Sequence, residues 1–168
     1  VFNRTKSVEN KWKKKFIAEK FYFNNDVKFD FIISCLKDDH AVNSFFNKFV
    51  KTSNFHKNSI IIDHSTISLR QIDILFKLFK QRKVKFLDAP VSGGVARAKT
   101  GDLMIMAGGD EKILEVVNDL LSIMGKVQFA GPLGSGHAIK ALNNYVSAAG
   151  LISSFEALAT ARSFGIEP

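Results

Sequence analysis

Short apolar runs alternate with amphipathic stretches along most of this chain. Runs rich in Ile, Val and Phe, bounded by polar residues, predict buried strands, whereas apolar residues recurring three and four positions apart predict helices. The predicted strands lie at residues 29–36, 59–63, 85–89, 102–107 and 127–129, with residues 1–2 as the tail of an earlier strand. The predicted helices cover residues 7–15, 41–50, 68–80, 110–124 and 135–164.

Two of these helices show which face we expect to be buried. Their inward positions are Val42, Phe45, Phe46 and Phe49 in the first, and Ile72, Leu75, Phe76 and Phe79 in the second. Ser68 is the expected N-cap of the second helix. Asp110 and Glu111 open the next helix with charges that suit its positive end.

The alternation of strands and helices predicts an α/β fold with a mostly parallel, doubly wound sheet covered on both faces. The last predicted helix breaks this rhythm. At roughly 1.5 Å per residue it spans about 45 Å, which is longer than a crossover helix needs. We therefore expect residues 1–132 to form one domain, and residues 133–168 to form a helix that leads into an all-α domain.

Composition excludes several classes of protein. Hydrophobic residues make up 46% and charged residues 24% of the 168 residues, which is typical of a globular chain and not of a disordered one. Cys35 is the single cysteine, so a disulfide scaffold is excluded, and a reducing compartment is favoured. The apolar runs fall short of the ~20 residues of a membrane span. Because residue 1 is Val, the sequence leaves the cytoplasm and the mitochondrial matrix both open.

Positive charge is concentrated at the N-terminal end. Residues 1–28 hold eight Lys and Arg against three acids, a net charge of +5 out of +8 for the whole chain. Such a stretch could attract nucleic acid or an anionic cofactor. It lacks the regularly interleaved aromatic residues of a nucleic-acid platform, so we interpret it as a solvated helix face.

In open α/β sheets, ligands bind at the carboxyl ends of the strands, so the loops that follow the predicted strands are the first place to look for chemistry. No strand is followed by the nucleotide fingerprint G-x-G-x-x-G; Gly134-Ser135-Gly136 opens a helix, but Ile139 stands at the third glycine position. The loops expected to meet at one edge are residues 3–5, 36–39, 63–66, 88–94 and 131–136.

Two of these loops have the composition of anion sites. At the end of a second strand, an acid would bind the ribose of NAD, whereas Arg4 suits the 2′-phosphate of NADP; an ordinary exposed Arg beside an N-cap Thr5 is the alternative. In the other loop, Gly93 and Gly94 let backbone N–H groups turn toward an anion, and Ser92 adds a hydroxyl. That arrangement suits a substrate carboxylate, and a plain turn is the alternative.

Lys140 and Asn144 lie four residues apart on the last predicted helix and therefore share a face. A Lys held near apolar surface can have its pKa lowered into the range useful for proton transfer, and an Asn one turn on can orient it. A snorkelling Lys with a solvated Asn is the alternative. His137 is interpreted as a polar residue of the first helical turn, and the spacing of the other histidines predicts no metal site.

Together, these segments resemble a known family. Residues 88–98 (DAPVSGGVARA) followed by 101–109 (GDLMIMAGG) resemble the substrate loop of the β-hydroxyacid dehydrogenases, the 3-hydroxyisobutyrate dehydrogenase family. Residues 134–144 (GSGHAIKALNN) resemble its catalytic segment, G-x-G-x-x-x-K-x-x-x-N. Residues 3–5, 35–36 and 63–66 fall in the order and spacing of its cofactor loops, so the resemblance covers essentially the whole chain.

The resemblance implies a Rossmann-type domain, an all-helical second domain, and NAD(P)-dependent interconversion of a small β-hydroxyacid and its semialdehyde. It implies that Lys140 is the general acid/base and that Asn144 orients Lys140 and the substrate. The implied carboxylate site is Ser92, Gly93 and Gly94. The implied cofactor residues are Leu36 and Thr66 beside the nicotinamide and Asn3, Arg4 and Thr5 beside the adenosine ribose. Arg4 favours NADP over NAD, as in the glyoxylate and succinic-semialdehyde reductase branch.

The sequence also departs from that family. The first strand with its glycine-rich loop and most of the helical domain do not occur in it, and Lys37 stands where the family usually has Pro. We therefore expect an incomplete Rossmann-type fragment or truncated gene product that binds cofactor poorly and turns over little by itself, and a homo-oligomer at full length. A catalytically inactive dehydrogenase-like binding module that uses its basic N-terminal segment for an acidic partner is the alternative, and a 6-phosphogluconate-type enzyme is a closer variant.

Overall fold

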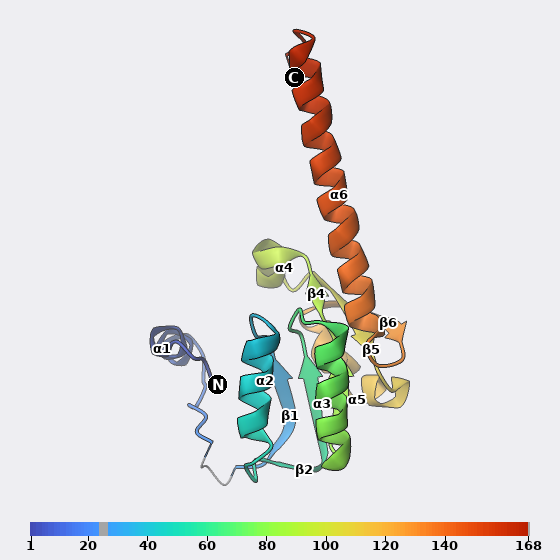
Figure 1. Cartoon of the computed structure of the whole chain (residues 1–168). Coiled ribbons are helices and arrows are strands. Elements are labelled where there is room, and N and C mark those ends of the chain that lie inside the picture. The colour runs from blue at the N-terminus through green and yellow to red at the C-terminus, as the bar shows by residue number, and fades with distance from the viewer. Residues whose placement is uncertain (24–26, 168) are drawn as a thin grey trace.

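The computed structural model describes residues 1–23 and 27–167. Figure 1 shows a twisted sheet with helices on both faces and one long helix that rises away from it. The strands are β1 (Phe29–Ser34), β2 (Phe55–Asp63), β3 (Lys85–Asp88), β4 (Val91–Ser92), β5 (Leu103–Gly108) and β6 (Gly125–Gly131). The helices are α1 (Lys6–Lys15), α2 (Asp39–Phe49), α3 (Leu69–Gln81), α4 (Gly94–Thr100), α5 (Glu111–Ser122) and α6 (Ser135–Ser163).

The sheet is parallel on one side and mixed on the other. β1, β2 and β3 are parallel neighbours, and β5 and β6 form a second parallel pair. β5 runs antiparallel to β3 and β4, and it meets β3 only where Gly108 lies opposite Asp88. The predicted α/β class is therefore confirmed, and β5 accounts for the antiparallel part of the sheet.

Two hydrophobic cores explain the continuous apolar run of β2. Ile61 is fully buried on the face covered by α2 and α3, where it joins Phe46 and Phe79. Ile60 and Ile62 point to the opposite face and are buried under α5. A strand covered on both faces needs apolar side chains at every position, so the periodicity of two disappears, as predicted.

The helix caps follow the sequence closely. The Ser68 hydroxyl accepts a hydrogen bond from the Gln71 N–H, and the Asp110 carboxylate accepts one from the Lys112 N–H, so both predicted helix starts are confirmed. The inward face of α3 differs at one position. Phe76 is 40% exposed, because α2 and the sheet cover the side of α3 that carries Ile72, Leu75 and Phe79.

The first residues do not form the predicted strand tail. Residues 1–3 have no ladder partner, and Val1 makes two hydrogen bonds, accepting from the Phe21 N–H at 2.8 Å and donating from its N-terminal ammonium to the carbonyl O of Glu19 at 2.5 Å. Ring packing holds the segment instead, with the ring centroid of Phe2 5.4 Å from that of Phe23 and 5.3 Å from that of Phe45. Phe2 therefore contacts aromatic rings without a strand neighbour, although it stays 41% exposed.

The region around the two glycines contains elements that the sequence pattern did not predict. Val91 and Ser92 form the short β4 beside β5, and α4 begins at Gly94. Adjacent glycines after a proline look like a plain turn, because a two-residue strand has no periodicity to detect.

α6 extends well beyond the sheet, as Figure 1 shows. Its outer part carries large exposed apolar side chains, namely Leu142, Tyr145, Val146, Leu151, Ile152, Phe155 and Leu158. Within residues 1–23 and 27–167, no helix combines the length and apolar character needed to cross a membrane.

Candidate active site

The loops at the carboxyl ends of the parallel strands are tied together by hydrogen bonds. The Leu36 N–H, after β1, donates to Oγ of Ser65, after β2, at 2.8 Å. The Ala89 N–H, after β3, donates to the carbonyl O of Asp63 at 2.8 Å. These bonds bring the loops after β1, β2 and β3 to one edge, as parallel strands require.

Asp63 organises the loop after β2. Its Oδ1 accepts hydrogen bonds from the hydroxyls of Ser34 at 2.7 Å and Ser65 at 2.6 Å, and the carboxylate is fully buried. This network holds Leu36 and Ser65 in contact and leaves the neighbouring Thr66 exposed at the sheet edge. Thr66 is therefore accessible to a ligand, next to residues that this network of hydrogen bonds holds together.

Asp88 caps α6 from a distance in the sequence. Its Oδ1 accepts from the Gly134 N–H at 2.7 Å and its Oδ2 from the His137 N–H at 3.0 Å, so a fully buried carboxylate supplies the N-terminal capping bonds. Gly134 itself, at φ +90°, makes no side-chain cap. The loop after β6 thereby joins the same edge.

Glycines permit this close approach of α6 to the sheet. A Cβ on Gly136 would clash with the carbonyl O of Met106 and would lie 2.9 Å from Oδ2 of Asp88. A Cβ on Gly108 would clash with Oδ1 of Asp88. The absence of a side chain at Gly136 therefore allows α6 to pack directly against β3 and β5.

His137 is buried between two strands. Its ring lies with Nδ1 3.1 Å from Oδ2 of Asp88 and Nε2 2.7 Å from the carbonyl O of Ser65. It does stand in the first turn of α6, but it is only 3% exposed, which the sequence interpretation missed. The available signal was Asp88 at the end of a buried strand, because a buried carboxylate needs hydrogen-bond donors.

Lys140 and the Ser92 loop lie on neighbouring elements. Lys140 is half-buried one turn after His137, and burial lowers the pKa of its amine. Nδ2 of Asn143, on the next turn, donates to Oγ of Ser92 at 3.4 Å. Asn144, the residue singled out from the sequence, is exposed, and the hydrogen bond to the Ser92 loop comes instead from its neighbour Asn143.

Gly93 and Gly94 adopt backbone conformations that favour glycine, with φ of +136° and +65°. A Cβ at Gly93 would lie 2.9 Å from the side chain of Arg97, so this turn is also sterically restricted to glycine. Ser92 and the two glycines thus form a sharply turned segment beside α6.

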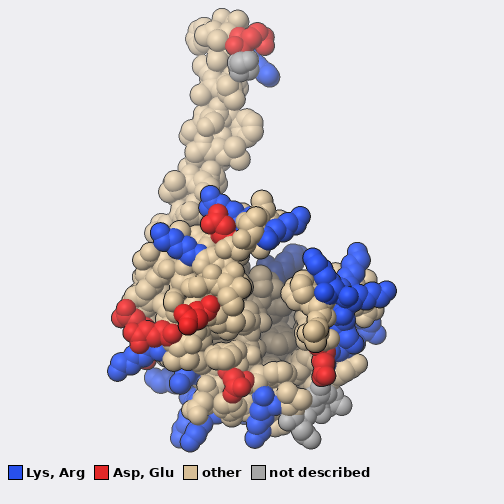
Figure 2. Space-filling view, turned by 180° about the vertical axis from the view of Figure 1, so that it is seen from behind, with Lys and Arg blue, Asp and Glu red and all other residues tan. Residues whose placement is uncertain are grey.

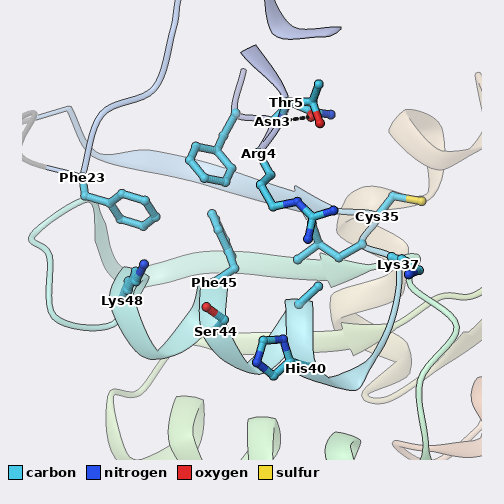
Figure 3. Close-up of a pocket in the computed structure, with 13 residues that line it drawn as sticks. Asn3, Arg4, Thr5, Phe23, Cys35, Lys37, His40, Ser44, Phe45 and Lys48 are labelled. Carbon is cyan, nitrogen blue, oxygen red and sulfur yellow. Dashed lines mark hydrogen bonds between the residues drawn. The ribbon is translucent and has the colours of Figure 1, made fainter. Parts of the chain in front are cut away.

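A pocket of about 450 Å³ lies between the N-terminal segment and α2. Figure 3 shows Arg4 extending toward the loop after β1, with Lys37, His40 and Lys48 around the same space. The lining combines these basic groups with aromatic rings and contains no carboxylate. The complete lining is Phe2, Asn3, Arg4, Thr5, Phe23, Cys35, Leu36, Lys37, His40, Ala41, Ser44, Phe45 and Lys48.

Four of the five expected cofactor residues therefore share this pocket: Asn3, Arg4, Thr5 and Leu36. Thr66 is outside its lining and lies along the edge near Ser65. Thr5 occupies the N-cap position of α1, but Oδ1 of Asn3 accepts from the Thr5 N–H at 2.8 Å while the Thr5 side chain makes no cap.

Two further titratable groups lie at this edge. Burial lowers the pKa of His64, against the opposing effects of the Ala89 carbonyl and Asp63. Burial, with a smaller contribution from Asp63, raises the pKa of the Cys35 thiol. In the part of the chain that the structure describes, no three His, Cys, Asp or Glu side chains converge on a metal site.

Comparisons with known proteins place this geometry in context. Residues 1–134 match the family described as the NAD binding domain of 6-phosphogluconate dehydrogenase. The mitochondrial 3-hydroxyisobutyrate dehydrogenase of Bos taurus is 38% identical over 113 residues, which cover 67% of this chain and 34% of that protein. The chain thus spans about a third of the length of this curated relative.

Solved structures give the same picture. A putative oxidoreductase from Mycobacterium avium superposes with a TM-score of 0.89 at 25% identity, covering 99% of this chain and 60% of that one. The 3-hydroxyisobutyrate dehydrogenase of Mycobacterium tuberculosis, solved with L-serine, superposes with a TM-score of 0.78 at 31% identity, covering 84% of this chain and 48% of that one.

Proposed function

This chain belongs to the family of the NAD binding domain of 6-phosphogluconate dehydrogenase, and we propose that it serves an NADP-dependent oxidoreductase that interconverts a small β-hydroxyacid and its semialdehyde. The Rossmann-type fold and the family resemblance predicted from the sequence are confirmed. The reaction is a proposal because the chain matches only about a third of the bovine dehydrogenase.

The pocket under Arg4 supports NADP as the cofactor. A ribose 2′-phosphate needs cationic donors; Arg4 and Lys48 supply them without a carboxylate in the lining, while the Lys37 amine lies 3.9 Å from Oδ2 of the adjacent Asp38. NAD binding in this position would instead favour an acidic residue for the ribose hydroxyl. The residues present therefore fit a phosphorylated ribose better than an unphosphorylated one.

Lys140 is the group that would handle the proton. When bound, the cofactor supplies or accepts the hydride. The Lys140 amine, whose pKa burial lowers, would donate a proton to the substrate oxygen during reduction and take it back during oxidation. Ser92 with the N–H groups of Gly93 and Gly94 would hold the carboxylate, and Leu36 and Thr66 would border the reacting end of the cofactor.

One observation carries this proposal: the α6 segment with Lys140 lies against the Ser92 turn, as the Asn143–Ser92 hydrogen bond at 3.4 Å records. Residues from positions 92 and 140–143 could form one substrate site only if α6 and β4 were neighbours. Asn143 therefore joins Asn144 as a candidate for orienting the substrate.

The cofactor half of the proposal is tested with 2′,5′-ADP, which carries the phosphorylated ribose without the nicotinamide. Isothermal titration of the chain should show at least about tenfold tighter binding of 2′,5′-ADP than of 5′-AMP, equivalent to ~1.4 kcal/mol. Arg4→Ala should abolish the difference, whereas the exposed Arg70→Ala on α3 should preserve it. Equal affinities for the two nucleotides in the unmodified chain would contradict the NADP assignment.

The reaction is tested in a chimera in which this chain replaces its matching segment of the M. tuberculosis 3-hydroxyisobutyrate dehydrogenase. We expect NADPH oxidation with a small semialdehyde, reduced about a hundredfold or more by Lys140→Ala. Lys112→Ala, at an exposed position on α5, is the matched control and should leave turnover unchanged. Unimpaired turnover of the Lys140 variant would refute the assigned role.

The binding-module alternative rests on the surface of α1. Five exposed lysines crowd this helix, and Figure 2 shows them as a basic cluster at one side of the molecule. Trp12 is 50% exposed among them. A salt-dependent gel shift with DNA, together with no binding of 2′,5′-ADP, would favour this alternative over the enzyme.

A further inference from the structure

The ring of His137 lies between two oxygen atoms that can only accept hydrogen bonds. Oδ2 of Asp88 lies 3.1 Å from Nδ1, and the carbonyl O of Ser65 lies 2.7 Å from Nε2. A neutral imidazole carries one N–H and can donate to one of them, whereas an imidazolium carries two. An unpaired buried acceptor or ring nitrogen is costly, so the geometry favours the charged form.

We infer that His137 is a buried imidazolium at neutral pH, and that its ion pair with Asp88 fastens the start of α6 to the sheet and so positions Lys140. The part that concerns Lys140 rests on the proposed function, while the charge state of His137 does not. His137 is a positioning residue in this scheme, because it acts through Lys140 and touches no reacting atom.

The charges around His137 agree with this assignment. Asp88, at the end of β3, is fully buried, accepts from the Gly134 N–H and the His137 N–H, and has its Oδ2 3.1 Å from Nδ1 of the His137 ring. Because a carboxylate without a counter-charge is expensive to bury, an imidazolium partner offsets its desolvation. Without the imidazolium, Asp88 would face only the partial positive charge of the N–H groups at the start of α6.

The other titratable groups near this edge come from β2 and from α6 itself. Asp63 is linked to His137 through Ser65, whose hydroxyl it binds and whose carbonyl accepts from the ring. Burial lowers the pKa of His64, which precedes Ser65, and of Lys140, which lies one turn further along α6. Asp88 and Asp63 therefore supply negative charge on the side of the sheet.

The geometry links His137 to Lys140 through the helix. The two residues are separated by slightly less than one turn, so fixing the His137 ring against β3 and the loop after β2 fixes the rotation of α6 at Lys140. The contact of Gly136 with β5 fixes the distance between helix and sheet at the same point. Loosening this attachment would expose Lys140 to water.

The charge state is tested by NMR of the chain labelled at its histidine ring nitrogens. At about pH 7, we expect His137 to show two N–H signals with imidazolium nitrogen shifts. A neutral, single-tautomer spectrum for His137 would overturn the inference. This spectrum is independent of cofactor binding and turnover, so its outcome is separate from that of the proposed function.

The positioning role is tested with Asp88→Asn, which retains an oxygen acceptor but removes the charge. We expect loss of the imidazolium signals and a rise of the Lys140 titration midpoint toward the ordinary lysine pKa of 10.5, followed by lysine side-chain NMR. Asp110→Asn, the same substitution at the exposed N-cap of α5, should change neither signal. A Lys140 midpoint that stays unchanged while the His137 charge is lost would refute the positioning role. If Asp88→Asn does not fold, the histidine spectrum of the unmodified chain still decides the charge state.

Discussion

Gly136→Ala adds one methyl group where α6 meets the sheet. The new Cβ would clash with the carbonyl O of Met106 and would lie 2.9 Å from Oδ2 and 3.0 Å from the carbonyl O of Asp88. Two of these three neighbours are backbone atoms, so rotation of a side chain cannot relieve the contact. The start of α6 must move away from β3 and β5, which stretches the hydrogen bonds from Gly134 and His137 to Asp88.

The expected loss of stability follows from three contributions. Overpacking costs about 1–3 kcal/mol. Loss of one hydrogen bond to a charged group costs about 1.5–3 kcal/mol. Replacing Gly by Ala inside a helix returns roughly 1 kcal/mol. The net destabilisation is about 3 kcal/mol, which corresponds to a fall in Tm of roughly 6–12 °C for a chain of this size.

The control is Gly150→Ala in the same helix. Gly150 is exposed, and a Cβ there would meet nothing within 4 Å, so this substitution should stabilise the helix by up to about 1 kcal/mol. Urea denaturation followed by circular dichroism compares the two variants, and hydrogen exchange at the His137 amide reports on the attachment of α6 directly. Equal stability of both variants, or unchanged exchange at His137 in Gly136→Ala, would show that α6 does not depend on this contact.

Three more predictions follow from the buried groups. Because burial lowers the pKa of His64 below its ordinary 6.5, the unfolded chain binds this proton more readily than the folded chain. The contribution of His64 to the free energy of unfolding should therefore be full above about pH 6.5 and should decrease as pH drops toward the folded-state pKa. Urea midpoints measured against pH should show this decrease, and His64→Asn should flatten it. The Lys140 amine should titrate below the ordinary lysine pKa of 10.5 in lysine NMR, and a titration at that ordinary value would contradict the burial argument. Phe79→Ala should cost about 3–5 kcal/mol in unfolding free energy, since Phe79 is fully buried, whereas Phe76→Ala, at a 40% exposed position of the same helix, should cost far less; similar losses would refute the assignment of the buried face of α3.

The positions of the strands and helices were largely predictable, because periodicity and capping are local properties. The apolar run at Ile60–Ile62 indicates a strand covered on both faces, and the structure shows α2 and α3 on one side of it and α5 on the other. Ser68 and Asp110 mark helix starts because their side chains reach N–H groups two or three residues away. The meeting of the loops after β1, β2 and β3 followed from the rule that parallel strands end at one edge, whereas Asn3 and Arg4 share a pocket with Leu36 without belonging to a strand.

Local pattern failed where contacts between distant residues decide the conformation. Val1 and Phe2 have the composition of a strand, but pairing needs a neighbour, and the structure offers ring packing against Phe23 and Phe45 instead. The Asn143 contact with Ser92 likewise depends on how α6 crosses β5, which no spacing within residues 134–144 specifies.

The sequence by itself determined the order of strands and helices, the class of fold and the segments that carry polar chemistry, because each of these depends on residues within about one turn of one another. Only the tertiary structure decided that Asp88 and His137, 49 positions apart, share a hydrogen bond inside the protein. Because both side chains are buried, each needs a hydrogen-bond partner inside the protein, and their contact attaches α6 to the sheet. Burial arises only when the sheet and helices pack together, so the local sequence around either residue does not reveal it.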